Sequence, residues 1–248
     1  MGVLGLWCRL RLAAAPRRLD CVTTVHVVRV FTDEAGEFGN PLGVVLDTTG
    51  LAEEQRREIA AALNFSETVF VEDVSQALLR IFTPATELAL AGHPLVGTAW
   101  LLSQLSGVEA KTLRPLRAAN VDTWAQDGVT WIRARVADAP PWSFQQLDTP
   151  AEVDALPFPT APDLEATEYW SWLDEASGQV RARFFAPSHG VPEDEATGSA
   201  ALRLVAMLGR PIVIRQGQGS LLYARPCPDD DRRAEVGGRV VRDADREI

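Results

Sequence analysis

An internal repeat constrains this chain more than any other feature of its sequence. Residues 80–84 (RIFTP) are matched by residues 183–187 (RFFAP), at an offset of 103 residues. Each copy is followed by a loop, a glycine with a polar neighbour (Gly92 and His93, then Gly198 and Ser199) and an apolar segment. Two copies of strand, loop and apolar helix predict two related halves that face each other. A chance similarity of two short motifs is the alternative.

Local hydrophobic patterns predict an α/β chain. Apolar and β-branched runs over residues 22–31, 42–47, 67–73 and 77–83 are typical of strands. Residues 51–63 predict an amphipathic helix with Leu51, Ile59, Ala62 and Leu63 near one apolar face. The helices that begin near His93 and Gly198 are apolar enough to be buried. Residues 111–136 predict two or three strands around a turn at 126–128. The proline-rich stretch 137–168 has the composition of a linker.

Composition narrows the class of protein. The 248 residues carry 24 Lys plus Arg against 34 Asp plus Glu, a net charge of −10. This balance argues against a nucleic-acid partner and against an anionic membrane surface. Three Cys without a CxxC pattern and three widely spaced His argue against a disulfide framework and a local metal motif, so we expect no metal and a cytoplasmic location. No stretch is long and apolar enough to span a bilayer.

Residues 1–21 differ in character from the rest of the chain. Arg9 and Arg11 interrupt the apolar run too early for a secretory signal, and the Arg-rich, acid-poor composition lacks the Ser of a transit peptide. We therefore expect a disordered extension, or one produced by a start site placed too early.

The repeat also indicates where chemistry could occur. A helix N-terminus presents unpaired N–H groups and the positive end of a dipole, so two such ends could hold an anionic substrate. His93 could transfer protons if it faces a cleft, although a structural role is the more frequent one. Glu67, where an apolar strand begins, would have a raised pKa if desolvated. Glu193 and Glu195 are interpreted as partners of the helix dipole.

The sequence resembles the phenazine biosynthesis PhzF-like family, which shares the diaminopimelate epimerase fold. The resemblance rests on VFTDEAGEFGNPLGVVLD (30–47), NFSETVFV (64–71), RIFTPATELALAGHPLVGTA (80–99), RFFAPSHGVPEDEATGSAALRL (183–204), RQGQGSLLYARP (215–226) and VGG (236–238). It implies an α/β (α+β) fold of two lobes, each a curved, mostly antiparallel sheet or barrel around a central helix. It also implies a homodimer and cofactor-free isomerisation or epimerisation, in which a proton moves between carbons of a small carboxylate-bearing metabolite.

The same resemblance implies roles for individual residues. The expected catalytic residues are Glu67, His93 and Asp194. The expected substrate-binding residues are Asn40, Gly92, Thr197, Gly198 and Ser199. Ala91 and Thr197 occupy the places of the two facing thiols of the Cys-dependent epimerases with this fold, which argues against a two-thiol mechanism.

Two departures from the family pattern leave an alternative open. Glu195 stands where the family has proline, and the chain between the two repeats is short. We expect an N-terminal lobe over residues 22–145 and a C-terminal lobe, shortened at its start, over residues 146–248. The alternative function is a catalytically silent small-molecule binding protein or a dimeric scaffold that keeps the cleft without turnover.

Overall fold

The computed structural model describes residues 22–159, 161 and 163–248. The expected extension over residues 1–21 lies outside these ranges. The strands are β1 (Thr24–Thr32), β2 (Asn40–Val45), β3 (Glu67–Asp73), β4 (Leu78–Phe82), β5 (Glu87–Leu88), β6 (Thr112–Pro115), β7 (Val121–Gln126), β8 (Val129–Arg135), β9 (Ser143–Gln146), β10 (Thr167–Asp174), β11 (Gln179–Ala186), β12 (Val191–Asp194), β13 (Ile212–Gln216), β14 (Ser220–Pro226), β15 (Arg233–Arg242) and β16 (Arg246–Glu247). The helices are α1 (Glu53–Leu63), α2 (Gly92–Ser106), α3 (Pro150–Ala155) and α4 (Gly198–Leu208), with 3-10 turns η1 (Val136–Asp138) and η2 (Pro187–His189).

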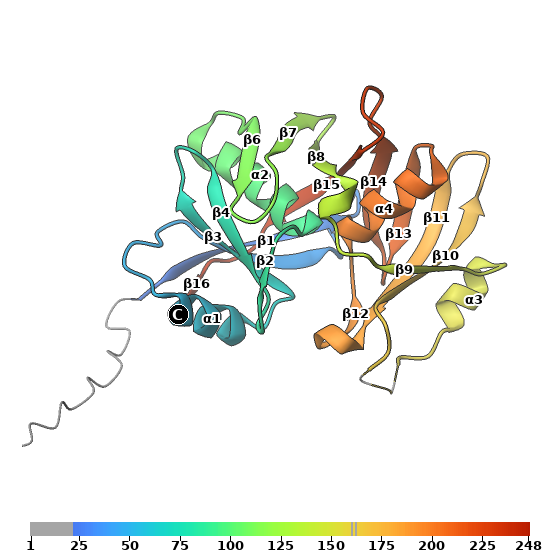
Figure 1. Cartoon of the computed structure of the whole chain (residues 1–248), viewed down its shortest axis with the longest axis horizontal. Coiled ribbons are helices and arrows are strands. Elements are labelled where there is room, and N and C mark those ends of the chain that lie inside the picture. Colours follow the sequence, from blue (N-terminus) through green and yellow to red (C-terminus); the bar gives the residue numbers. More distant parts are fainter. Residues whose placement is uncertain (1–21, 160, 162) are drawn as a thin grey trace, which may run out of the picture.

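The strands form two lobes that lie side by side and share one continuous hydrogen-bonded path (Figure 1). The path runs β16-β1-β2-β3-β4-β6-β7-β8-β15-β14-β13-β11-β10-β9. Helix α2 contacts β1, β2, β3, β7, β8 and β15, and α4 packs against β14 and β15. Both helices are buried, as their apolar sequences predict, and the expected fold of two lobes around central helices is confirmed.

The internal repeat reappears in the strand pairing. Most neighbouring strands are antiparallel, but β2 and β3 are parallel, and so are β4 and β6. In the second lobe β9 and β10 are parallel, and so are β11 and β13. The order of elements around each central helix is therefore the same in both lobes. The second lobe does contain counterparts of β2 and α1, namely β9 and α3, but both are shorter than in the first lobe.

The repeated arginine has the same role in both lobes. Arg80 of β4 pairs with Glu87 of β5 at 2.6 Å, and Arg183 of β11 pairs with Glu193 of β12 at 2.8 Å. Each guanidinium also lies over the ring of the phenylalanine two residues later, at 4.9 and 4.7 Å from its centroid. These contacts hold the short return strand that leads towards each central helix. Glu193 is thus an arginine partner, and its interpretation as a partner of the helix dipole was wrong.

The two central helices begin against each other. A Cβ atom built on Gly92 would lie 2.6 Å from the Cα of Gly198, which no real side chain tolerates. The ring of Phe31 lies against Gly198 at this contact. Phe31 has φ +68°, and the pairing of β1 with β15 is irregular at this residue. Only glycine at both helix starts allows the backbones to approach so closely.

The chain between the lobes differs from the expected linker. Residues 137–168 contain β9 and α3, and the expected boundary between residues 145 and 146 falls within β9. Thr149 and Glu152 form a capping box at α3, and Pro150 occupies the first turn, where its missing N–H is harmless. At the other end of the chain, β15 pairs with β8 and β14 through residues 233–238 and with β1 through residues 239–242. The last strands thus join both lobes.

Within the described ranges no helix is long and apolar enough to cross a membrane.

Candidate active site

Glu67 stands at the start of β3, just after the chain leaves α1. Asn64 ends α1 with φ 52°, and this left-handed turn brings the chain back towards the sheet. The Glu67 side chain is only 16% exposed, and its Oε2 atom is buried without a hydrogen-bond partner among the described residues. Burial, and then the negative charge of Asp194, raise the pKa of Glu67 to about 8. The carboxyl group is therefore mostly protonated at neutral pH.

His93 lies beside Glu67, in the first turn of α2. Its Nε2 atom is 3.4 Å from Oε2 of Glu67, and neither atom has a hydrogen-bond partner within the described ranges. The ring is 3% exposed, and this burial lowers the pKa of His93 to about 3. The imidazole is therefore neutral. After a small movement, a protonated Glu67 can donate a hydrogen bond to Nε2 of a neutral His93.

Asp194 ends β12 and belongs to the second lobe. Asn40 Nδ2 donates to its Oδ1 at 2.6 Å, and Thr197 Oγ1 donates to its Oδ2 at 2.6 Å. Burial raises the pKa of Asp194 to about 6, while these two hydrogen bonds act in the opposite direction. Asn40 also donates to the carbonyl of Ala196 at 2.9 Å, so this residue of β2 joins the first lobe to the loop before α4.

Gln216 supports this cluster and was not among the expected site residues. Its Oε1 accepts from the backbone N–H of Thr197 at 3.0 Å. Its Nε2 donates at 2.9 Å to both the carbonyl of Asp194 and Oγ1 of Thr197. In the sequence, Gln216 stands between an apolar strand and a glycine turn, and no pattern marked it as a site residue; the structure shows that it is fully buried and hydrogen-bonded. Gln216 fixes the Thr197 hydroxyl so that it donates to Asp194.

Glu195 has its own partners in the same loop. Its carboxylate accepts from the backbone N–H of Gln218 and from the hydroxyl of Ser220. It does not lie in the first turn of α4, so the interpretation of Glu195 as a partner of the helix dipole was wrong. The charge that replaces the family's proline is accommodated by the turn between β13 and β14.

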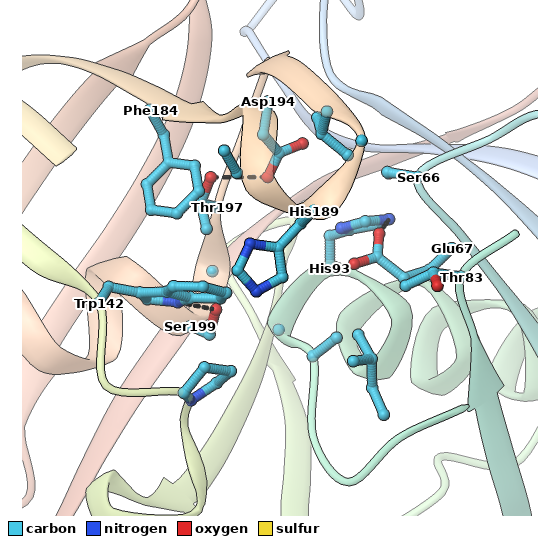
Figure 2. A pocket seen from close by; sticks show the side chains of 18 of the residues that line it. Ser66, Glu67, Thr83, His93, Trp142, Phe184, His189, Asp194, Thr197 and Ser199 are labelled. Carbon is cyan, nitrogen blue, oxygen red and sulfur yellow. Dashed lines mark hydrogen bonds and ion pairs between the residues drawn. The ribbon is translucent and has the colours of Figure 1, made fainter. Parts of the chain in front are cut away.

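The side chains surround a cavity of about 610 Å³ between the lobes. Figure 2 shows Glu67 and His93 on one side and Asp194, Thr197, Trp142 and Ser199 on the other. The expected site residues that line it are Glu67, Gly92, His93, Asp194, Thr197, Gly198 and Ser199. Asn40 does not line it and acts through Asp194 instead. Sequence reasoning missed Trp142 and His189, which do line it.

The groups that could bind an anion in this cavity are backbone N–H groups rather than cationic side chains. Among the described residues that line it there is no Lys or Arg. The starts of α2 and α4 both reach the cavity through Gly92 and Gly198, and neither helix has a side-chain cap. Their first N–H groups have no acceptor within the helix and can bind an anion. Over the described ranges no three His, Cys, Asp or Glu residues cluster as metal ligands would.

Comparisons with known proteins identify the family of this chain. The phenazine biosynthesis-like protein family (PhzC-PhzF) matches residues 28–118. The chain is 33% identical to a protein of Pseudomonas chlororaphis named trans-2,3-dihydro-3-hydroxyanthranilate isomerase, over 82% of this chain and 91% of the relative.

Solved structures show the same fold. A PhzF-family phenazine biosynthesis protein of Enterococcus faecalis superposes with a TM-score of 0.74 at 21% identity, covering 92% of this chain and 99% of the other. A hydroxyproline epimerase of Agrobacterium vitis superposes with a TM-score of 0.60 at 12% identity, covering 94% of each chain. The chain therefore belongs to the phenazine biosynthesis-like family and is an isomerase of the PhzF type.

Proposed function

We propose that this protein moves a proton between carbons of a small carboxylate-bearing metabolite, without a cofactor. The observation that carries the proposal is the Glu67 carboxyl group, which is buried at the cavity with an unpartnered oxygen 3.4 Å from a neutral His93. Leaving a polar atom buried without a partner is unfavourable by about 1–3 kcal/mol. A catalytic role is one explanation for such a group, and the position of Glu67 at the cavity supports it.

In the proposed reaction, ionised Glu67 takes a proton from a carbon next to an unsaturated or carbonyl group. The raised pKa of Glu67 makes its carboxylate a stronger base than an exposed glutamate. The proton on Glu67 exchanges with solvent, and Glu67 then returns a proton to another carbon, while neutral His93 can accept a hydrogen bond from the protonated carboxyl group. Asp194, held by Asn40 and Thr197, keeps a negative charge near Glu67. General acid/base catalysis of this kind typically contributes about 10²–10⁴-fold.

The substrate is proposed to bind through its carboxylate at the two helix starts. The N–H groups at Gly92 and Gly198 would also stabilise negative charge that develops on the substrate as the proton leaves. The relatives named trans-2,3-dihydro-3-hydroxyanthranilate isomerase make that compound the first one to test.

Deuterium exchange tests the proposal. The purified protein is incubated in D₂O with trans-2,3-dihydro-3-hydroxyanthranilate and then with pools of small carboxylic acids, and the products are analysed by mass spectrometry. We expect one deuterium on a carbon of one compound. Glu67→Gln should abolish the exchange and leave the fold intact. Glu54→Gln, a change at an exposed position of α1, should exchange at the normal rate.

Normal exchange by the Glu67→Gln protein would refute the role of Glu67. No incorporation into any acid would favour the catalytically silent binding protein or dimeric scaffold. The homodimer is likewise a proposal, which light scattering of the purified protein would test. We also propose that the protein works in the cytoplasm, where the buried free thiol of Cys227 would stay reduced.

A further inference from the structure

Trp142 lies at the wall of the cavity, directly over the start of α4. Its indole Nε1 donates a hydrogen bond of 2.9 Å to Oγ of Ser199, as the dashed line in Figure 2 shows. Trp142 belongs to the stretch whose composition had predicted a linker, so no sequence pattern had marked it as a site residue.

The segment that carries Trp142 is fastened to the same helix. Arg203, one turn beyond Ser199 in α4, donates to the carbonyl of Ala139 through both Nε and Nη2, at 3.3 and 2.9 Å. Two prolines, at positions 140 and 141, limit the conformations of the chain between these contacts. The position of Trp142 relative to Ser199 is therefore fixed by two contacts to a single helix.

The indole ring is also fixed in orientation. Phe184 meets it edge to face at a centroid distance of 5.2 Å, and His189 does so at 5.3 Å. All three side chains line the cavity. Aromatic pairs at these distances and angles are favourable. They keep the indole N–H directed at Ser199.

The direction of this hydrogen bond decides what Ser199 can offer a ligand. An indole N–H can only donate, so the Ser199 oxygen must accept. The hydroxyl proton makes no other hydrogen bond within the described residues, and Ser199 lines the cavity. The hydroxyl therefore presents a donor, beside the N–H groups that the start of α4 already presents.

We infer that Trp142 is a positioning residue that makes the α4 end of the cavity specific for an acceptor-only group, the carboxylate of the substrate. A ligand group that can donate, such as a carboxamide, would place its N–H groups against the donors of Ser199 and the helix start. This inference rests on the proposed function, because it assigns the carboxylate of the proposed substrate to one end of the same cavity.

Calorimetric titration with benzoate and with benzamide tests the inference at pH 7. The two probes have the same ring and differ in the acceptor-only or donating character of their polar group. We expect the unaltered protein to prefer benzoate. Trp142→Phe keeps a ring and removes the N–H. It should reduce the preference for benzoate about tenfold, because the Ser199 hydroxyl would no longer be oriented to donate to the charged carboxylate. Ser199→Ala should reduce it by a similar factor.

The double variant distinguishes positioning from simple packing. Once the Ser199 hydroxyl is absent, Trp142→Phe should not change the benzoate preference further. The control is Trp124→Phe, since Trp124 stacks on Trp131 and does not line the cavity; it should leave the preference unchanged. Circular dichroism would check that each variant is folded.

The inference is overturned if the unaltered protein does not prefer benzoate, if Trp142→Phe keeps the full preference, or if the effects of the two changes simply add. The titration requires no turnover. If deuterium exchange fails while the preference depends on Trp142, the proposed proton transfer fails and the carboxylate site remains. If deuterium exchange is observed and the preference for benzoate does not depend on Trp142, only the inference about Trp142 fails.

Discussion

Glu168 gives the sharpest test of the electrostatics in the second lobe. It is the second residue of β10 and is fully buried, and neither of its carboxyl oxygens has a hydrogen-bond partner within the described part of the chain. It faces Phe184 on β11, which in turn faces Asp194 on β12. Burial, and then the charge of Asp194, raise the pKa of Glu168 from 4.5 to about 8. Folding therefore keeps this carboxyl group protonated.

The sign of the pH dependence follows from this. Below pH 4.5 Glu168 is protonated in both the folded and the unfolded chain, so its ionisation does not change the free energy of unfolding. As the pH rises from 4.5 to 8 the unfolded chain loses the proton while the folded chain keeps it, so the free energy of unfolding falls. One pH unit corresponds to about 1.4 kcal/mol, so up to about 5 kcal/mol is lost by pH 8.

Replacing Glu168 by Gln removes this loss, because the amide is neutral at every pH. Urea denaturation followed by tryptophan fluorescence should give similar stabilities for the two proteins at pH 4.5. At pH 8 the variant should be more stable by about 3–5 kcal/mol. A difference between the two proteins that does not change over this range would refute the reasoning.

Glu235 of β15 provides a matched control. It is also buried, at 2% exposed, but Arg133 and Arg225 both donate to its carboxylate. Glu235→Gln leaves two partly exposed guanidinium groups without a charged partner, and should lower the stability at pH 8 by about 2 kcal/mol. Opposite outcomes for two buried glutamates would show that pairing, rather than burial alone, decides the sign.

Two further predictions concern turnover. Gly92→Ala must push the helix starts apart by about 1 Å, since its Cβ would lie 2.6 Å from Gly198 Cα, and the rate of deuterium exchange should therefore fall about 100-fold. The control is Gly107→Ala, which has open space around its Cβ and φ +67°. It should lower the stability by about 1 kcal/mol and leave the exchange rate unchanged. The value of kcat/KM should rise with pH up to about 8, where Glu67 becomes ionised. Asp194→Asn should move this rise to lower pH, because it removes a negative charge near Glu67. A pH profile that is flat between 5 and 8 would contradict the assignment of Glu67 as the base.

The local signals in the sequence proved informative wherever a single segment carried them. The repeated arginine motif predicted two related lobes, and both arginines make the same pair of contacts in the structure. The apolar helices were correctly predicted to be buried. For the amphipathic helix the expected face was partly wrong: Ile59 and Leu63 are buried as expected, Ala62 is exposed, and Arg56 is buried through its pairing with Glu72.

Contacts between distant segments could not be predicted in this way. Asn40 meets Asp194 across 154 residues, and Trp142 meets Ser199 across 57 residues. Neither pair shares a strand or helix whose periodicity would relate the two positions. The capping box at Thr149 was a local signal that could have identified α3, but the surrounding prolines obscured it.

From the sequence, one could predict that two similar units exist, that each contains a buried helix beginning at a glycine, and that Glu67 and Asp194 stand beside apolar strands. The three-dimensional fold was needed to show that both carboxyl groups line one cavity, that Gln216 and Asn40 hold Asp194 in place, and that the Trp142 indole donates to Ser199. The physical reason is that helix and strand patterns record burial along one segment. The pKa of a carboxyl group and the direction of a hydroxyl depend instead on neighbours that the folding of other segments brings into contact.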